Sequence, residues 1–175
     1  MSSLSRSASE LLVQYARYHR DPRNIATHFV GIPLIVFAIG ALLARPTWGT
    51  GLSPAGLLWL LTTLWYLTRG QFTLGLVVSL ANLGLVVLAA LLVQGPTLGL
   101  GWSLALLTLG WALQFMGHYY EGRKPAFVDD LLGLFVGPLF ITAEALFALG
   151  WGHALRDEIQ RRAGPTRLRN LAMPA

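Results

Sequence analysis

The chain alternates between long stretches that carry no charged residue and short clusters of charge. No Asp, Glu, Lys or Arg occurs in residues 24–44, 46–68 or 70–120. Because a membrane-spanning helix needs about 20 consecutive apolar residues, the first two stretches each predict one span and the third predicts two. The four predicted spans are residues 28–44, 52–67, 72–93 and 98–117.

A fifth apolar segment, residues 131–151, is interrupted by the pair Gly137-Pro138. Such a segment is predicted either to cross the membrane or to enter and leave it on one side. Amphipathic helices with arginines that reach lipid phosphates are predicted at both ends of the chain. The predicted fold class is thus an all-α integral membrane helix bundle with four transmembrane helices plus the fifth segment. It forms one domain, 1–175, made of an interfacial helix (8–23), a membrane bundle (28–151) and a basic cytoplasmic tail (152–175).

The composition agrees with this interpretation and removes several alternatives. Hydrophobic residues make up 54% of the chain and charged residues 12%, about half of the roughly 25% found in soluble domains. An ordinary water-soluble globule is disfavoured, and a disordered chain is excluded. The net charge of +5 comes from basic residues that flank the apolar runs, which suits anionic lipid headgroups better than nucleic acid. The chain contains no cysteine, so a metal must be held by His, Asp, Glu or backbone oxygen.

Basic residues also predict the orientation in the membrane. If the fifth segment is re-entrant, 12 of the 13 Lys and Arg residues lie on one side, and Arg45 alone lies on the other. Basic residues are retained on the cytoplasmic side, so both termini are predicted to be cytoplasmic. If the fifth segment crosses fully, this bias disappears. Twelve Arg against one Lys suggests a GC-rich genome and hence a bacterial inner membrane, or the endoplasmic reticulum if the protein is eukaryotic.

Three of the four histidines are predicted to meet at one depth. His28 begins the first predicted span and His118 ends the fourth. Four crossings return the chain to the side on which it started, so these two rings lie at the same interface, with His19 just before the first span. Asp21 favours a helix N-cap and Pro22 the first helical position. The predicted break at these residues allows His19 and His28 to point toward a common centre.

Neighbours one helical turn away are predicted to support two of these rings. Tyr15 and His19 are separated by four residues, as are Asn24 and His28. Each pairing provides a partner that fixes the tautomer of an imidazole. Tyr15 and Asn24 are therefore predicted to assist the chemistry of the site.

A polar stripe lies at the end of the fourth predicted span. Gln114, His118 and Glu121 share one face of the helix there. Polar groups at this depth are expensive and usually line a site. Glu144 is a second costly residue, inside the fifth apolar segment. His153 lies beyond that segment and is best interpreted as an interfacial anchor.

A single interfacial histidine is most often only a tolerated polar residue, but three at one depth in a chain without cysteine favour a metal site. Imidazole with oxygen ligands suits zinc, iron, copper or nickel, and open coordination positions suit oxygen chemistry at Fe(II). Four histidines without clustered histidine boxes disfavour a di-iron membrane oxygenase. The sequence contains no Gly-x-Ser-x-Gly motif, so a serine hydrolase is weakly supported.

The polar motifs resemble those of one family. The chain is similar, over about residues 12–150, to the family of the fungal protein for metabolism of phytosphingosine to odd-numbered fatty acids. The matching stretches read YARYHRDPRNIATHFVGIP from residue 15 and QFMGHYYEGRKPAFVDDLLGLFVGPLFITAEALFALG from residue 114. The motifs within them are Tyr15-x-x-x-His19, Asn24-x-x-x-His28-x-x-Gly31-x-Pro33, Gln114-Phe115-x-Gly117-His118 and Pro125-Ala126.

The resemblance implies an Fe(II)-dependent dioxygenase that uses O2 to convert 2-hydroxy fatty acids to fatty acids shorter by one carbon and CO2. By motif position it implies His19, His28 and His118 as iron ligands, and Glu121 as a ligand or a base. Membrane lipids surround such an enzyme, and its substrate's acyl tail lies between helices. The alternative is a non-enzymatic membrane module that binds lipid or carries a solute or metal, and a purely structural bundle ranks third.

Overall fold

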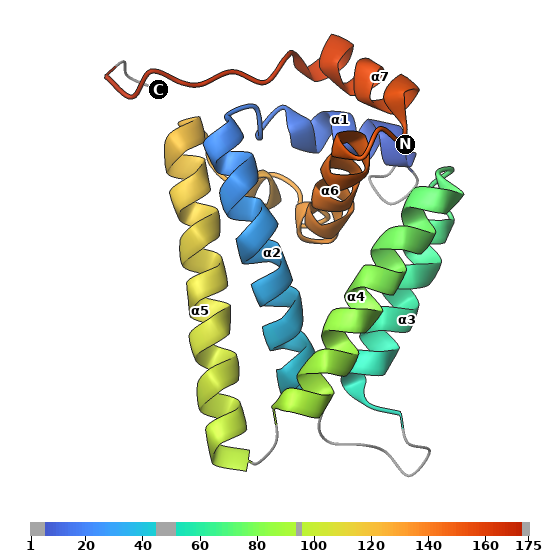
Figure 1. Ribbon diagram of the computed structural model, residues 1–175, viewed down its shortest axis with the longest axis vertical. Coiled ribbons are helices and arrows are strands. Elements are labelled where there is room, and N and C mark those ends of the chain that lie inside the picture. The colour runs from blue at the N-terminus through green and yellow to red at the C-terminus, as the bar shows by residue number, and fades with distance from the viewer. Residues whose placement is uncertain (1–5, 45–51, 94–95, 173–175) are drawn as a thin grey trace.

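The computed structural model describes residues 6–44, 52–93 and 96–172, and these residues form helices joined by turns, without strands (Figure 1). This confirms the predicted all-α bundle. The helices are α1 (Ala8–Ala16), α2 (Pro22–Leu43), α3 (Pro54–Leu67), α4 (Phe72–Leu92), α5 (Pro96–Glu121), the short 3-10 helix η2 (Ala126–Val128), α6 (Gly133–Ala148) and α7 (His153–Ala163).

Within the described residues, three helices are long and apolar enough to cross a membrane by themselves. These are α2, α4 and the Gly99–Glu121 part of α5. The predicted span 52–67 is the helix α3, which has only 14 residues because Ser53 caps it and Pro54 occupies its first turn. The fifth segment is not a straight span: α6 and α7 meet at an angle of 119°, and together they count as a broken span or a re-entrant loop.

The long helices form two pairs that lean against each other (Figure 1). α2 packs along α5, and α3 packs along α4. The first pair is close because Gly110 lies at the crossing: a Cβ atom on Gly110 would lie 2.9 Å from the main-chain oxygen of Gly31. α6 contacts α2 and α4 at the end of the bundle where α2 begins. The chain therefore returns to this end after α5, as the sequence predicted for His28 and His118.

α1 and α7 cover that same end of the bundle (Figure 1). α1 begins with a capping box in which Ser7 and Glu10 exchange hydrogen bonds. Leu11 and Leu12 of α1 are buried in a core that also contains Phe140 of α6 and Ile159 of α7. The N-terminal helix thus packs between α7 and the rest of the protein instead of exposing its apolar face.

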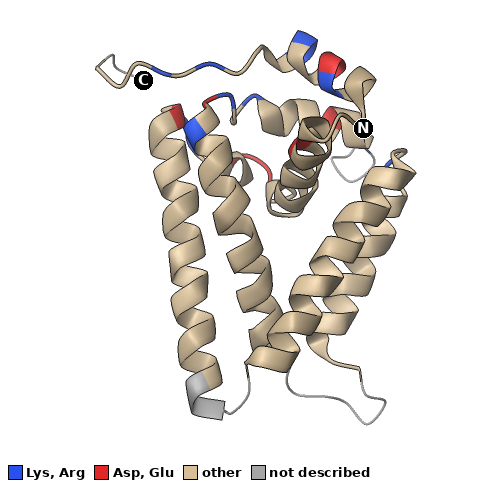
Figure 2. Cartoon of the chain, in the orientation of Figure 1, with Lys and Arg blue, Asp and Glu red and all other residues tan. Residues whose placement is uncertain are grey.

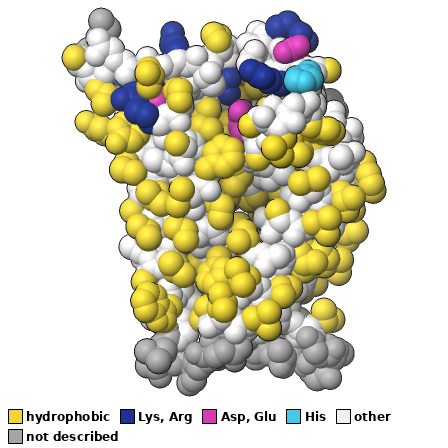
Figure 3. Space-filling view, viewed as in Figure 1, with side chains coloured by type: hydrophobic (Ala, Val, Ile, Leu, Met, Phe, Trp, Pro, Cys, Tyr) yellow, Lys and Arg dark blue, Asp and Glu magenta, His cyan; other side chains and the backbone are white. Residues whose placement is uncertain are grey.

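Charge is concentrated at the end where α1 and α7 lie, and apolar side chains cover the sides of the bundle (Figures 2 and 3). Leucines such as Leu61, Leu80 and Leu91 are more than half exposed. An exposed apolar girdle of this kind is the surface that a bilayer covers, so the chain is a membrane protein. Arg45, which was predicted to lie alone on the opposite side, is outside the described residues.

Candidate metal centre

The three predicted histidines lie together at the charged end of the bundle. His19 belongs to the turn between α1 and α2, His28 lies in the second turn of α2, and His118 lies in the last turn of α5. Each ring offers one ligand atom, and the three atoms all lie within 4.8 Å of one another. All three side chains are buried. The structure therefore brings His19, His28 and His118 together, as the sequence predicted.

The tautomers of His19 and His28 follow from their hydrogen bonds. The Nδ1 atom of His19 lies 2.8 Å from the carbonyl oxygen of Tyr15, and that of His28 lies 2.9 Å from the carbonyl oxygen of Asn24. A carbonyl only accepts, so each Nδ1 carries the proton and each Nε2 carries a lone pair. The two Nε2 atoms lie 3.0 Å apart. Two lone pairs at this distance repel each other unless a cation lies between them.

The separation of the two Nε2 atoms fits a divalent transition metal. Nitrogen ligands about 2.1 Å from one ion and 90° apart lie about 3.0 Å from each other, which is the separation of the two Nε2 atoms. The Nδ1 atom of His118 is buried and has no hydrogen-bond partner among the described residues. Burial lowers the pKa of His19 well below its usual range, and the rings of His28 and His118 lower it further. A neutral imidazole is the form that binds a metal.

Tyr15 and Asn24, which the sequence predicted as partners of the histidine rings, bind them through their main-chain carbonyls. The Tyr15 ring also stacks on His19, with ring centroids 4.0 Å apart and planes within 3°. The side-chain amide of Asn24 donates to Glu121 at 3.1 Å. The spacing of four residues thus identified the correct pairs, although the atom that fixes each tautomer is a backbone oxygen.

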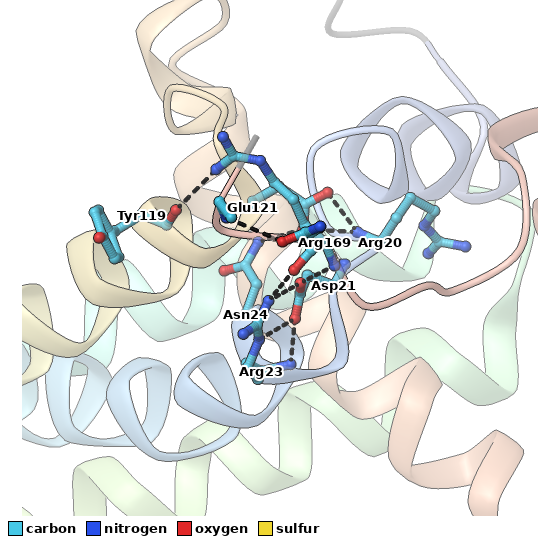
Figure 4. Close-up of polar contacts among 9 residues, drawn as sticks. Arg20, Asp21, Arg23, Asn24, Tyr119, Glu121 and Arg169 are labelled. Carbon is cyan, nitrogen blue, oxygen red and sulfur yellow. Dashed lines mark hydrogen bonds and ion pairs between the residues drawn. The ribbon is translucent and has the colours of Figure 1, made fainter. Parts of the chain in front are cut away.

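Glu121 lies outside the three-histidine group and binds the turn between α1 and α2 (Figure 4). Its carboxylate accepts hydrogen bonds from the main-chain N–H of Arg20, at 2.9 and 3.0 Å, and of Asp21, at 2.8 Å. The side-chain amide of Asn24 donates to Oε2 as well, so Oε2 accepts three hydrogen bonds, whereas Oε1 accepts only the one that it shares from Arg20. Glu121 thus holds the turn that carries His19, and its role as a metal ligand or a base stays a prediction.

The C-terminal tail crosses the same turn, a contact that the sequence did not indicate. Asp21 caps α2 by accepting from Arg23 N at 2.9 Å, and it also accepts from the main-chain N–H of Arg169 at 2.8 Å. The main-chain N–H of Arg167 donates to the carbonyl of Arg20 at 2.9 Å. Hydrogen bonds from Arg23 lower the pKa of Asp21 to about 2. The tail, predicted only as a basic cytoplasmic segment, fixes the turn largely through backbone groups.

A cavity of about 300 Å³ extends from the histidines into the bundle. Its wall includes His28 and His118 at one end and Gly40 and Ala55 at the other. Twelve residues of α2 separate His28 from Gly40, which corresponds to about 18 Å at 1.5 Å per residue. The acyl chains of one leaflet fill about half of a hydrocarbon core that is about 30 Å thick, so the cavity has the length of a long acyl chain. Figure 3 shows the surface hollowed between the two helix pairs.

Two polar residues singled out from the sequence lie away from the cluster. His153 is the first residue of α7 and is exposed. Glu144 is half-buried on α6 and is not among the grouped ligands. Gln114 lies one helical turn before His118 and lines the cavity.

Together the fold and the histidine group define a membrane-embedded helical protein with a buried candidate metal site at the head of an apolar cavity. The comparison with known families specifies this class further. The model of the family described as 2-hydroxy-palmitic acid dioxygenase Mpo1-like matches residues 5–149. The chain is 32% identical over 152 residues to the 2-hydroxy-palmitic acid dioxygenase MPO1 of Saccharomyces cerevisiae, with 83% of each chain covered.

The chain therefore belongs to the Mpo1-like dioxygenase family. This confirms the resemblance found in the sequence motifs. No solved structure matches the chain.

Proposed function

We propose that the protein is an Fe(II)-dependent dioxygenase that shortens 2-hydroxy fatty acids by one carbon. The reaction consumes one 2-hydroxy acid and one O2, and it releases a fatty acid shorter by one carbon, CO2 and water. The bond between C1 and C2 of the substrate breaks, C2 is oxidised to the new carboxyl carbon, and O2 is reduced. The observation that carries the proposal is the pair of facing Nε2 lone pairs of His19 and His28, completed by His118, at the head of an acyl-sized cavity.

His19, His28 and His118 would hold the iron, and the remaining residues prepare the site. A bound ferrous ion supplies O2 activation and a chelation site for the hydroxyl and carboxylate of the substrate. The carbonyls of Tyr15 and Asn24 keep each ligand nitrogen deprotonated and aimed inward. Glu121 acts as a positioning residue, because it fixes the turn that presents His19.

The cavity accounts for the lipid substrate class. Its wall between α2 and α3 is apolar, with residues such as Ile35, Val36 and Leu58. An acyl tail placed there buries its methylenes at about 0.8 kcal/mol each, and it leaves the polar head at the histidines. The acyl tail also fills the cavity and so keeps bulk water away from the reacting atoms.

The charge distribution supports an orientation with both termini in the cytoplasm. The described basic residues gather at the end that α1 and α7 cover (Figure 2). In this orientation the whole chain forms one integral membrane domain, and the metal site opens near the cytoplasmic face. We propose the inner membrane of a bacterium as its location, on the arginine-rich composition.

The test uses the full chain in detergent. The purified protein is loaded with Fe(II), its iron content is measured, and it is incubated with 2-hydroxypalmitate under air and under nitrogen. Pentadecanoate is expected only when both Fe(II) and O2 are present. Metal uptake without any pentadecanoate would contradict the enzyme and favour the alternative of a carrier or a lipid-binding module.

Two variants at ligand positions and one matched control test the ligand assignment. His28→Ala should abolish iron binding and product formation, and His118→Ala should do the same. His153→Ala removes the exposed fourth histidine and should leave both unchanged. Equal iron content in the wild type and in His28→Ala would refute the proposed site.

A further inference from the structure

Gln114 has a buried side-chain amide that the proposed metal site does not use. The residue is only 5% exposed, and its Nε2 atom has no hydrogen-bond partner among the described residues. Burying an amide without a partner costs free energy comparable to a lost hydrogen bond. A buried polar group of this kind that borders a cavity is a site for a polar ligand atom.

The contact between α2 and α5 holds the amide in place. A Cβ atom at Gly31 would collide with Gln114 Nε2, so the glycine on α2 leaves the space that the amide fills. Gln114 lies one turn from His118 on α5, on the side of the bundle interior. Gln114 therefore lines the cavity at a fixed place just beyond the histidines, with its Nε2 atom packed against Gly31.

Two hydroxyl groups deeper in the cavity wall already have partners. The hydroxyl of Thr62 donates to the carbonyls of Leu58 and Trp59, at 2.9 and 3.0 Å. The hydroxyl of Tyr66 donates to the carbonyl of Phe135 at 2.8 Å. A ligand that extends along the cavity thus passes Gln114 near the histidines, and the hydroxyls of Thr62 and Tyr66 farther along already have partners.

We propose that Gln114 binds the 2-hydroxyl group of the substrate and so distinguishes 2-hydroxy acids from unsubstituted fatty acids. This inference rests on the proposed function. The unpartnered Nε2 atom of Gln114 donates hydrogen bonds, and a hydroxyl oxygen accepts them. C2 is also the last carbon that bears oxygen before the apolar tail, and Gln114 lies between the histidines and the apolar part of the cavity.

The experiment measures binding to the metal-free protein, so that no metal contributes to recognition of the hydroxyl. The full chain in detergent with a chelator is titrated with 2-hydroxypalmitate and with palmitate. The wild type should bind the 2-hydroxy acid about tenfold more tightly, as expected for one hydrogen bond in a buried site. Gln114→Met keeps the volume of the side chain and removes the amide. This variant should bind the two acids about equally, and its affinity for palmitate should be the same as that of the wild type. Gln160→Met makes the same change on α7, outside the cavity wall, and should leave the preference intact.

Other results would overturn the inference. A preference that survives in Gln114→Met, or an equal loss of affinity for both acids, would show that the amide does not contact the hydroxyl. Gln114→Leu is measured in the same way, and iron binding by both variants should stay at the wild-type level because the histidines are untouched. If the wild type forms pentadecanoate yet binds both acids equally, this inference fails alone. If the wild type loaded with Fe(II) forms no pentadecanoate under air, the proposed function fails and this inference fails with it.

Discussion

The Nε2 atoms of His19 and His28 face each other at 3.0 Å, while each ring turns its Nδ1 toward a main-chain carbonyl four residues earlier. The backbone fixes both tautomers, so neither ring can relieve the contact by moving its proton to Nε2 without losing a buried hydrogen bond. A cation bound between the two Nε2 atoms would therefore remove the repulsion between their lone pairs.

Metal binding should stabilise the folded protein for this reason. At a free metal concentration about 100 times the dissociation constant, the gain is about 2.7 kcal/mol. We expect Fe(II) added without oxygen to raise the midpoint of thermal unfolding in detergent, and a chelator to reverse the effect. His28→Ala should lose the metal-dependent rise, and His153→Ala should keep it. If Fe(II) does not change the midpoint of thermal unfolding of the wild type, that result would count against the metal site.

Replacing Glu121 by Gln should loosen the turn that carries His19. A neutral carbonyl would replace the charged oxygen that accepts from Arg20 and Asp21, and an NH2 group would face the Arg20 N–H that now donates to both carboxylate oxygens, so these hydrogen bonds should weaken. The expected cost is about 3 kcal/mol in stability, and metal affinity should fall about 10- to 100-fold, as for loss of a group that orients a ligand. Thermal unfolding and metal titration measure the two effects.

The same substitution at Glu158 provides the control for Glu121→Gln. Glu158 pairs with Arg162 on α7 at 2.8 Å, where both side chains are partly exposed. Exposed ion pairs of this kind contribute less than about 1 kcal/mol. Complete loss of metal binding in Glu121→Gln at saturating metal would instead restore Glu121 as a direct ligand.

Ala55 should set the length of the acyl chain that the cavity accepts. It is 3% exposed, lies at the start of α3, and forms the wall at the end away from the histidines. Ala55→Phe fills this end, so kcat/KM for 2-hydroxypalmitate should fall at least about tenfold, because each excluded methylene forfeits about 0.8 kcal/mol. Activity on 2-hydroxydecanoate should persist. Leu57→Phe, on the exposed face of the same helix, should change neither substrate's rate.

The sequence predicted the convergence of the three histidines because their positions depend only on how often the chain crosses the bundle. α3 is shorter than the span predicted there, yet it still returns the chain, so His28 and His118 lie at one end. The sequence also predicted the break between the first two helices at Asp21-Pro22, because helix capping depends only on neighbouring residues.

The parts that the sequence did not reveal depend on contacts between distant backbone groups. Glu121 meets the N–H groups of Arg20 and Asp21 across about a hundred residues, and no pattern of residue types encodes a main-chain partner. The sequence therefore could not indicate that Glu121 binds this turn, and its predicted role as a ligand or a base stays a prediction. The packing of α7 over α1 was equally hidden, because an amphipathic helix shows the same periodicity against lipid as against protein.

The C-terminal tail should protect the turn next to the metal site. Arg167 and Arg169 donate main-chain hydrogen bonds to Arg20 and Asp21, and the Arg20 guanidinium donates to the carbonyl of Gly164 at 2.8 Å. Removing residues 165–175 deletes the two backbone donors, so hydrogen exchange at the amides of residues 17–21 should accelerate while exchange in α4 stays slow. Removing only residues 171–175 keeps both donors and should change neither rate. If the longer truncation leaves exchange in the turn at the wild-type rate, Glu121 alone holds the turn and the tail contributes nothing to the site.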